Sequence, residues 1–170
     1  YFTINRARQF GKTTTLKALF RNLSDQYVVI SISFEIGDAI FDSVEGFCEG
    51  LGFKISEAAG VTSEQADFWL NECKCASFEG LSAKISAFCK SQTKPVLLLI
   101  DEVDKSTDNQ LFLNFLGMLR NKYLDRDLKG MNSTFYSVIL AGVYDVKKLK
   151  IKLRPDEERK YNSPWNIAAD

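Results

Sequence analysis

The chain has 170 residues, and its 22 Lys plus Arg balance its 22 Asp plus Glu, so the formal net charge is +0. This length suffices for one domain with a real core, and the charge balance gives no support for direct binding to nucleic acid or to a membrane surface. The sequence contains no histidine, which excludes histidine-based nucleophile systems and a histidine general base.

The four cysteines, Cys48, Cys73, Cys75 and Cys89, do not have zinc-site spacing, because the "CKC" at 73–75 is not a C-x-x-C pair. We interpret them as reduced, partly buried thiols of a cytoplasmic protein. No apolar run approaches the ~20 residues that a membrane span needs. The sequence therefore predicts neither a metal site at the cysteines nor a membrane-spanning segment.

In chain order, hydrophobic spacing predicts a strand at 1–4, a helix from about Thr13, a strand at 27–34 and a helix over 40–51 that ends at Gly52. A loop is expected at 53–63. The second half predicts helices at about 64–72 and 78–90, a strand at 96–100, a helix at about 109–124 and a strand at 135–142.

Strands that alternate with helices predict a three-layer α/β/α fold with a mostly parallel sheet. No linker divides the chain, so we expect one domain over residues 1–170. Because the sequence starts on a strand and without methionine, we expect a fragment of a longer protein.

The stretch "RARQFGKTT" at 6–14 contains Gly11-Lys12-Thr13, the second half of a phosphate-binding loop. Between a strand and a helix, such a loop presents backbone N–H groups and the positive end of the helix dipole to an anion. Lys12 would reach the β and γ phosphates and the Thr13 hydroxyl would bind Mg²⁺. The first glycine of the motif is replaced by Arg6, and the alternative is a turn with a solvated lysine.

The run "VLLLIDEVD" places Asp101 and Glu102 directly after a strand that is apolar enough for burial on both faces. Open α/β sheets bind ligands at the carboxyl ends of their strands. We expect Asp101 to hold Mg²⁺ and Glu102 to polarise an attacking water as the catalytic base. The alternative is an ordinary acidic loop, since Asp104 and Asp108 follow.

With both motifs in view, "INRARQFGKTTTL" resembles the Arg-rich, glycine-poor Walker A loop of the bacterial AAA-ATPase-like proteins, and "LLLIDEVD" is similar to their Walker B strand. "SVILAGVYDVKKLK" and "YNSPWNIA" resemble further segments that recur in members of this family. The resemblance covers nearly the whole chain. It implies a P-loop NTPase fold in which the strand at 135–141 lies between those at 1–4 and 96–100, and which is incomplete at its C-terminus.

The resemblance also implies ATP and Mg²⁺ as ligands, and members often carry an attached PD-(D/E)xK nuclease-like domain. Carried over by position, the residues that match the phosphate loop are Gly11, Lys12, Thr13 and Thr14, with Arg8 as a further cofactor-binding candidate. Thr13 and Asp101 are the metal candidates, and Glu102 is the catalytic candidate. Three positions depart from the family pattern: Ala7, Gln9 and Ala141, the last where a polar residue often ends a γ-phosphate-sensing strand.

Several further residues have two interpretations. Arg6 and Arg8 either neutralise phosphate or cap loop carbonyls. Glu35 either faces the site or is a solvated strand end. Arg120 or Arg126 either serves a neighbouring subunit as an arginine finger or is a solvated helix charge. The tryptophans Trp69 and Trp165 are expected to pack in a core or between domains rather than to stack on bases.

These observations predict an Mg²⁺-dependent ATPase that acts as the switch or motor domain of a larger protein. A homo-oligomer of this protein is a further expectation. The alternative is an interaction module that binds nucleotide without hydrolysing it. A nucleic-acid-associated ATPase is suggested only by the family's nuclease-like partner domain, and the balanced charge argues against direct contact by this chain.

Overall fold

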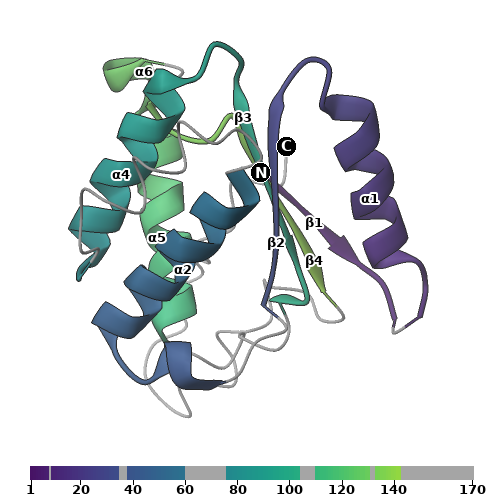
Figure 1. Ribbon diagram of the computed structural model, residues 1–170, viewed down its shortest axis with the longest axis horizontal. Helices are drawn as coiled ribbons and strands as arrows, with labels where there is room; N and C mark the ends of the chain where they lie inside the picture. The colour runs from purple at the N-terminus through teal and green to yellow at the C-terminus, as the bar shows by residue number, and fades with distance from the viewer. Residues whose placement is uncertain (8, 35–37, 60–75, 104–109, 131–132, 143–170) are drawn as a thin grey trace, which may run out of the picture.

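The computed structural model describes residues 1–7, 9–34, 38–59, 76–103, 110–130 and 133–142. Within them, strands and helices alternate along the chain (Figure 1). The strands are β1 (Phe2–Asn5), β2 (Val28–Ser33), β3 (Val96–Asp101) and β4 (Ser137–Gly142). The helices are α1 (Lys12–Leu23), the short 3-10 helix η1 (Asp38–Phe41), α2 (Val44–Ala59), α4 (Phe78–Ser91), α5 (Gln110–Leu124) and α6 (Arg126–Lys129).

The four described strands form one sheet in the order β1-β4-β3-β2, and every neighbouring pair is parallel. The predicted α/β fold with a parallel sheet is therefore confirmed, and so is the position of β4 between β1 and β3. Because all strands run the same way, their carboxyl ends meet at one edge of the sheet. The residues that follow β1 and β3 thus start from the same side of the molecule.

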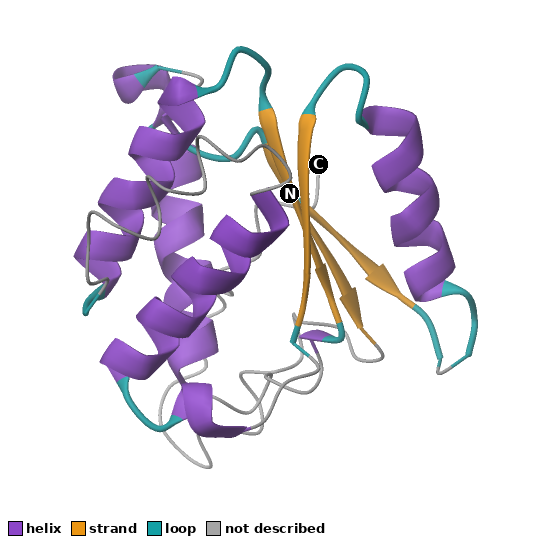
Figure 2. Cartoon of the chain, in the orientation of Figure 1, coloured by secondary structure: helices purple, strands orange, loops and turns teal. Residues whose placement is uncertain are grey.

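Helices cover both faces of the sheet, with α1 on one face and α2, α4 and α5 on the other (Figure 2). Successive side chains of β3 point to opposite faces of the sheet, so the strand contributes to a core on each face. Val96, Leu98 and Ile100 belong to the larger core cluster. Leu97 and Leu99 belong to a smaller cluster with Leu16 of α1. The larger cluster also contains the rings of Phe47, Phe88, Phe112, Phe115 and Phe135. The core is thus concentrated on the α2, α4 and α5 side.

Two predicted boundaries around α2 are wrong. Gly52 does not end the helix, and residues 53–59 are helical rather than a loop. Gly52, Ile55 and Ser56 are all buried on the helix face that packs on the sheet, so burial outweighs the cost of about 1 kcal/mol for a glycine inside a helix. The rest of the expected loop and the helix expected at 64–72 lie outside the described residues.

The helix predicted over 40–51 is in fact two elements, η1 and α2. Ser43 separates them, because its hydroxyl accepts a hydrogen bond from the N–H of Gly46 at 3.0 Å and so caps the start of α2. The predicted helices at 78–90 and 109–124 correspond to α4 and α5. The four-residue α6 was not predicted.

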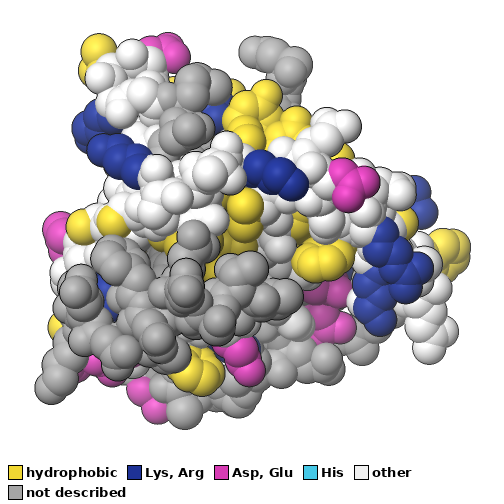
Figure 3. All heavy atoms as spheres, turned by 45° about the horizontal axis from the view of Figure 1, so that its top comes forward, with side chains coloured by type: hydrophobic (Ala, Val, Ile, Leu, Met, Phe, Trp, Pro, Cys, Tyr) yellow, Lys and Arg dark blue, Asp and Glu magenta, His cyan; other side chains and the backbone are white. Residues whose placement is uncertain are grey.

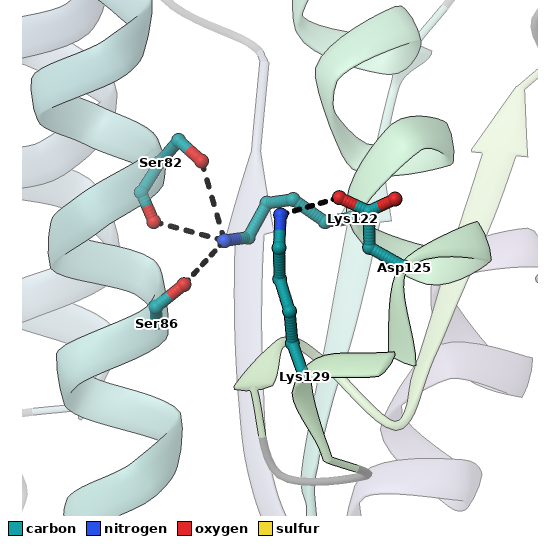
Figure 4. A network of polar contacts seen from close by, with 5 residues as sticks. All are labelled: Ser82, Ser86, Lys122, Asp125 and Lys129. Carbon is teal, nitrogen blue, oxygen red and sulfur yellow. Dashed lines mark hydrogen bonds and ion pairs between the residues drawn. The ribbon is translucent and has the colours of Figure 1, made fainter. Parts of the chain in front are cut away.

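A half-buried lysine joins α4 to α5. The ammonium of Lys122 donates to the backbone oxygen of Ser82 at 2.9 Å, to the Ser82 hydroxyl at 3.2 Å and to the Ser86 hydroxyl at 2.5 Å (Figure 4). Burial lowers the pKa of Lys122. The nearby pair of Lys129 and Asp125 is exposed, so it contributes little to stability.

Burial also raises the pKa of the Cys89 thiol, to about 12. Cys48 and Cys89 are both buried, and neither is in a disulfide, which agrees with the prediction of buried thiols. Cys73 and Cys75 lie outside the described residues.

We expect Lys122→Ala to lower the free energy of unfolding by about 1–2 kcal/mol, because the substitution leaves three oxygens of α4 without a charged donor at a partly solvated site. The measurement is urea denaturation followed by circular dichroism. Lys90→Ala is the matched control, since Lys90 is an exposed lysine in the last turn of α4. Equal stability of the two variants would contradict a structural role for Lys122.

Candidate nucleotide-binding site

The loop between β1 and α1 presents an open helix N-terminus. Gly11 is the N-cap residue of α1, with a left-handed φ of 73°, and no side chain caps the helix. The first turn of α1 also contains no acidic residue. The N–H groups of this turn and the helix dipole are therefore suited to an external anion, as predicted for a phosphate loop. Thr14 follows in the first turn of α1 and is exposed.

The loop ahead of Gly11 has an unusual backbone. Gln9 has a left-handed φ of 64°, which a non-glycine residue adopts at a cost. The N–H of Phe10 donates to the carbonyl of Ala7 at 3.3 Å, and Phe10 is 68% exposed. The sequence indicates no such conformation at Gln9, because glutamine has no preference for it.

Lys12 closes this loop on itself. Its ammonium donates to the backbone carbonyls of Arg6 at 3.0 Å and Ala7 at 3.1 Å. The predicted phosphate-binding lysine thus lies at the mouth of the loop. The alternative in which Arg6 caps the loop carbonyls is not what the structure shows: Lys12 binds them, and the guanidinium of Arg6 has no hydrogen bond or ion pair with the described residues. Arg8 lies outside the described residues.

The two predicted motifs meet directly. The Thr13 hydroxyl donates to Oδ2 of Asp101 at 2.7 Å, although the residues are 88 positions apart. Asp101 ends β3 and is buried, and its Oδ1 accepts the N–H of Glu102 at 2.9 Å. Proteins usually bind Mg²⁺ through one or two oxygen ligands of their own, and substrate phosphates supply further ligands. A hydroxyl beside a carboxylate provides such ligands. The described residues contain no cluster of three acidic or cysteine side chains that would bind a metal on its own.

Glu102 leaves β3 with a strained backbone. Its φ is 56°, and its side chain is half-buried. A non-glycine residue in this region costs about 1–3 kcal/mol and persists only where the surrounding structure enforces it. The hydrogen bond from the N–H of Glu102 to Asp101 is one such constraint, so the backbone directs Glu102 away from the path of the strand.

The arginines considered for a neighbouring subunit lie elsewhere. Arg126 packs 4.0 Å above the ring of Tyr123 and donates to the carbonyl of Tyr136 at 2.9 Å, at the amino end of β4 and so opposite the site. Arg126 is thus a packing residue in this chain rather than a solvated charge. Arg120 is half-buried, and its Nε has no hydrogen-bond partner within the described part of the chain. A finger role for either residue stays a prediction.

Three other candidates, Glu35, Trp69 and Trp165, lie outside the described residues. Ala141 is fully buried near the end of β4 and pairs with Ile4 of β1. Its small apolar side chain brings no polar group to the carboxyl edge of the sheet.

A parallel sheet in the order found here, with an uncapped helix after β1 and an acidic pair at the carboxyl end of β3, is typical of the class of P-loop nucleoside-triphosphate-binding proteins. The sequence matches the family model of the AAA-like domain over residues 1–145. The chain belongs to this family, and the family implies nucleotide binding. A comparison with curated proteins gave no match. Among the described residues, no helix is long and apolar enough to cross a membrane.

We expect Glu102→Gly to raise the free energy of unfolding by about 1 kcal/mol relative to Glu102→Ala, because glycine adopts a positive φ without the steric cost that alanine has. The two variants both lack the carboxylate, so their difference isolates the backbone strain. The measurement is denaturant unfolding of both variants side by side. A higher stability of the alanine variant would show that Glu102 is not strained in solution.

Proposed function

We propose that this chain binds ATP with Mg²⁺ and hydrolyses it, as the switch or motor domain of a larger protein. The observation that carries the proposal is the 2.7 Å hydrogen bond between Thr13 and Asp101. This contact joins the uncapped start of α1 to the acidic end of β3, which are the two halves of a phosphate and metal site. Adenine as the base rests on the family rather than on a residue that would read it.

Each residue has a role that follows from its position. Gly11 and the first turn of α1 bind phosphate oxygens through backbone N–H groups. Lys12 exchanges its two carbonyl partners for phosphate oxygens, and Thr13 and Asp101 hold the metal. Bound Mg²⁺ supplies positive charge that offsets the negative charge of the phosphates.

Glu102 is the proposed base for in-line hydrolysis. It accepts a proton from water as the water oxygen bonds to the γ-phosphorus, while the bond from that phosphorus to the β–γ bridging oxygen breaks and ADP leaves. The proton then passes from Glu102 to solvent. The strained φ of Glu102 supports this role, since strain of this kind concentrates at functional sites.

A nucleotide-binding module without hydrolysis is the second candidate. It is favoured by the apolar end of β4, where the buried Ala141 and Gly142 offer no side chain that could sense a γ-phosphate. An incubation of the chain with ATP and Mg²⁺, analysed for ADP by chromatography, separates the two candidates. Full conversion to ADP excludes the passive module.

The partners of this domain remain proposals. An attached nuclease-like or other effector domain rests on the family resemblance. A cytoplasmic location rests on the interpretation of the cysteines as reduced thiols, and a homo-oligomer is a further expectation that is linked to the arginine-finger candidates Arg120 and Arg126. Figure 3 shows one face of the molecule, on which the basic side chains of the described residues are scattered rather than gathered into one patch. Direct binding to nucleic acid is not part of this proposal, since the balanced net charge of the sequence does not favour it.

We expect Glu102→Gln to lower the rate of ATP hydrolysis by about 10²–10⁴-fold, the usual contribution of a general base, with ATP affinity kept within about threefold. Phosphate release and ATP binding are measured on the same preparation. Glu79→Gln is the control, because Glu79 is an exposed carboxylate in the first turn of α4. Equal phosphate release from wild type and Glu102→Gln would rule out Glu102 as the base.

A further inference from the structure

Arg6 occupies a junction between the phosphate loop and the end of β4. Its N–H donates to the carbonyl of Gly142 at 3.3 Å, and its own carbonyl accepts the Lys12 ammonium at 3.0 Å. The backbone of Arg6 is therefore in direct contact with the group that is proposed to bind the β and γ phosphates. A side chain as long as that of arginine can reach the same anion.

With a triphosphate bound, the site would contain more negative than positive charge, so a second cationic side chain would be favourable. Asp101 and Glu102 are both acidic, and a bound triphosphate adds several negative charges. Among the described residues of the loop, Lys12 is the lysine that can bind phosphate. The end of β4 brings no charged or polar side chain to the site, because it consists of the buried residues Ala141 and Gly142. Arg6 is exposed, and its guanidinium has no hydrogen bond or ion pair with the described residues, so this side chain can turn toward a phosphate without breaking a contact to them.

We propose that Arg6 contacts the terminal phosphate of ATP bound to its own chain and stabilises the charge that shifts during its transfer. This inference rests on the proposed function. A guanidinium is always charged and binds two phosphate oxygens through parallel N–H groups. Arginine at this position therefore supplies the polar contact that β4 lacks, and it replaces the glycine of the usual motif for a chemical reason.

The proposal predicts a selective effect on ATP over ADP. The test compares Arg6→Gly, which restores the usual first residue of the motif, with Arg6→Ala and the charge-keeping Arg6→Lys. Arg21→Ala is the control, because Arg21 is exposed in the last turn of α1, at the end of that helix opposite to the loop. Thermal unfolding of each variant verifies that it is folded.

Affinities for ATP and ADP are measured with Mg²⁺ by competition against a fluorescent ATP analogue, and kcat is measured by phosphate release. We expect Arg6→Ala and Arg6→Gly to weaken ATP binding about tenfold and ADP binding less than threefold, and to lower kcat at least tenfold. Arg6→Lys is expected to recover most of the ATP affinity but less of kcat, because lysine keeps the charge without the paired donors.

Two outcomes would overturn the proposal. Wild-type ATP affinity and turnover in Arg6→Gly would show that arginine only fills the first position of the loop. Equal losses for ATP and ADP would show that Arg6 does not reach the terminal phosphate. If the wild-type chain bound neither nucleotide, or if Lys12→Ala bound both as well as wild type, the proposed function itself would fail, and that result is distinct from insensitivity to Arg6.

Discussion

The hydrogen bond between Thr13 and Asp101 is the contact that defines this structure, because it exists only if the whole sheet is built correctly. It needs β3 to be parallel to its neighbours and buried on both faces, so that Asp101 emerges at the same edge as the loop after β1. It also needs α1 to start where β1 ends. The larger core under α2, α4 and α5 supplies the stability that holds these elements in place.

Several residues around that contact have conformations that lower the stability of the fold. Gln9 and Glu102 both have a left-handed backbone, and the start of α1 has no side-chain cap. Each of these features lowers stability without a ligand, since the strain and the uncapped N–H groups are not compensated within the described loop. The Lys12 ammonium offsets neither cost, because it donates to two loop carbonyls. A phosphate would take over that ammonium and the N–H groups together.

Much of this arrangement could be predicted from the sequence, and the reasons for the failures are specific. The apolar run of β3 identified a doubly buried strand, and the motifs at Gly11–Thr13 and Asp101 correctly indicated two segments that meet. The position of β4 came from the family resemblance. The end of α2 was missed because burial of Ile55 overrides the tendency of Gly52 to end a helix. The strained backbone at Gln9 and Glu102 has no signal in the residue types, because tertiary contacts impose it.

The two faces of the sheet have unequal cores, and the candidate site lies beside the weaker one. Within α1 only Leu16 is buried, and its cluster is much smaller than the one on the opposite face. The attachment of α1 therefore depends strongly on its first turn, where Thr13 binds Asp101. A nucleotide that bridged Lys12, Thr13 and Asp101 would add contacts at that same turn. Its binding energy would then stabilise the docking of α1 more than the rest of the fold, because the ligand contacts only the state in which helix and strand are together. Such coupling is the physical basis on which a nucleotide site of this kind can act as a switch.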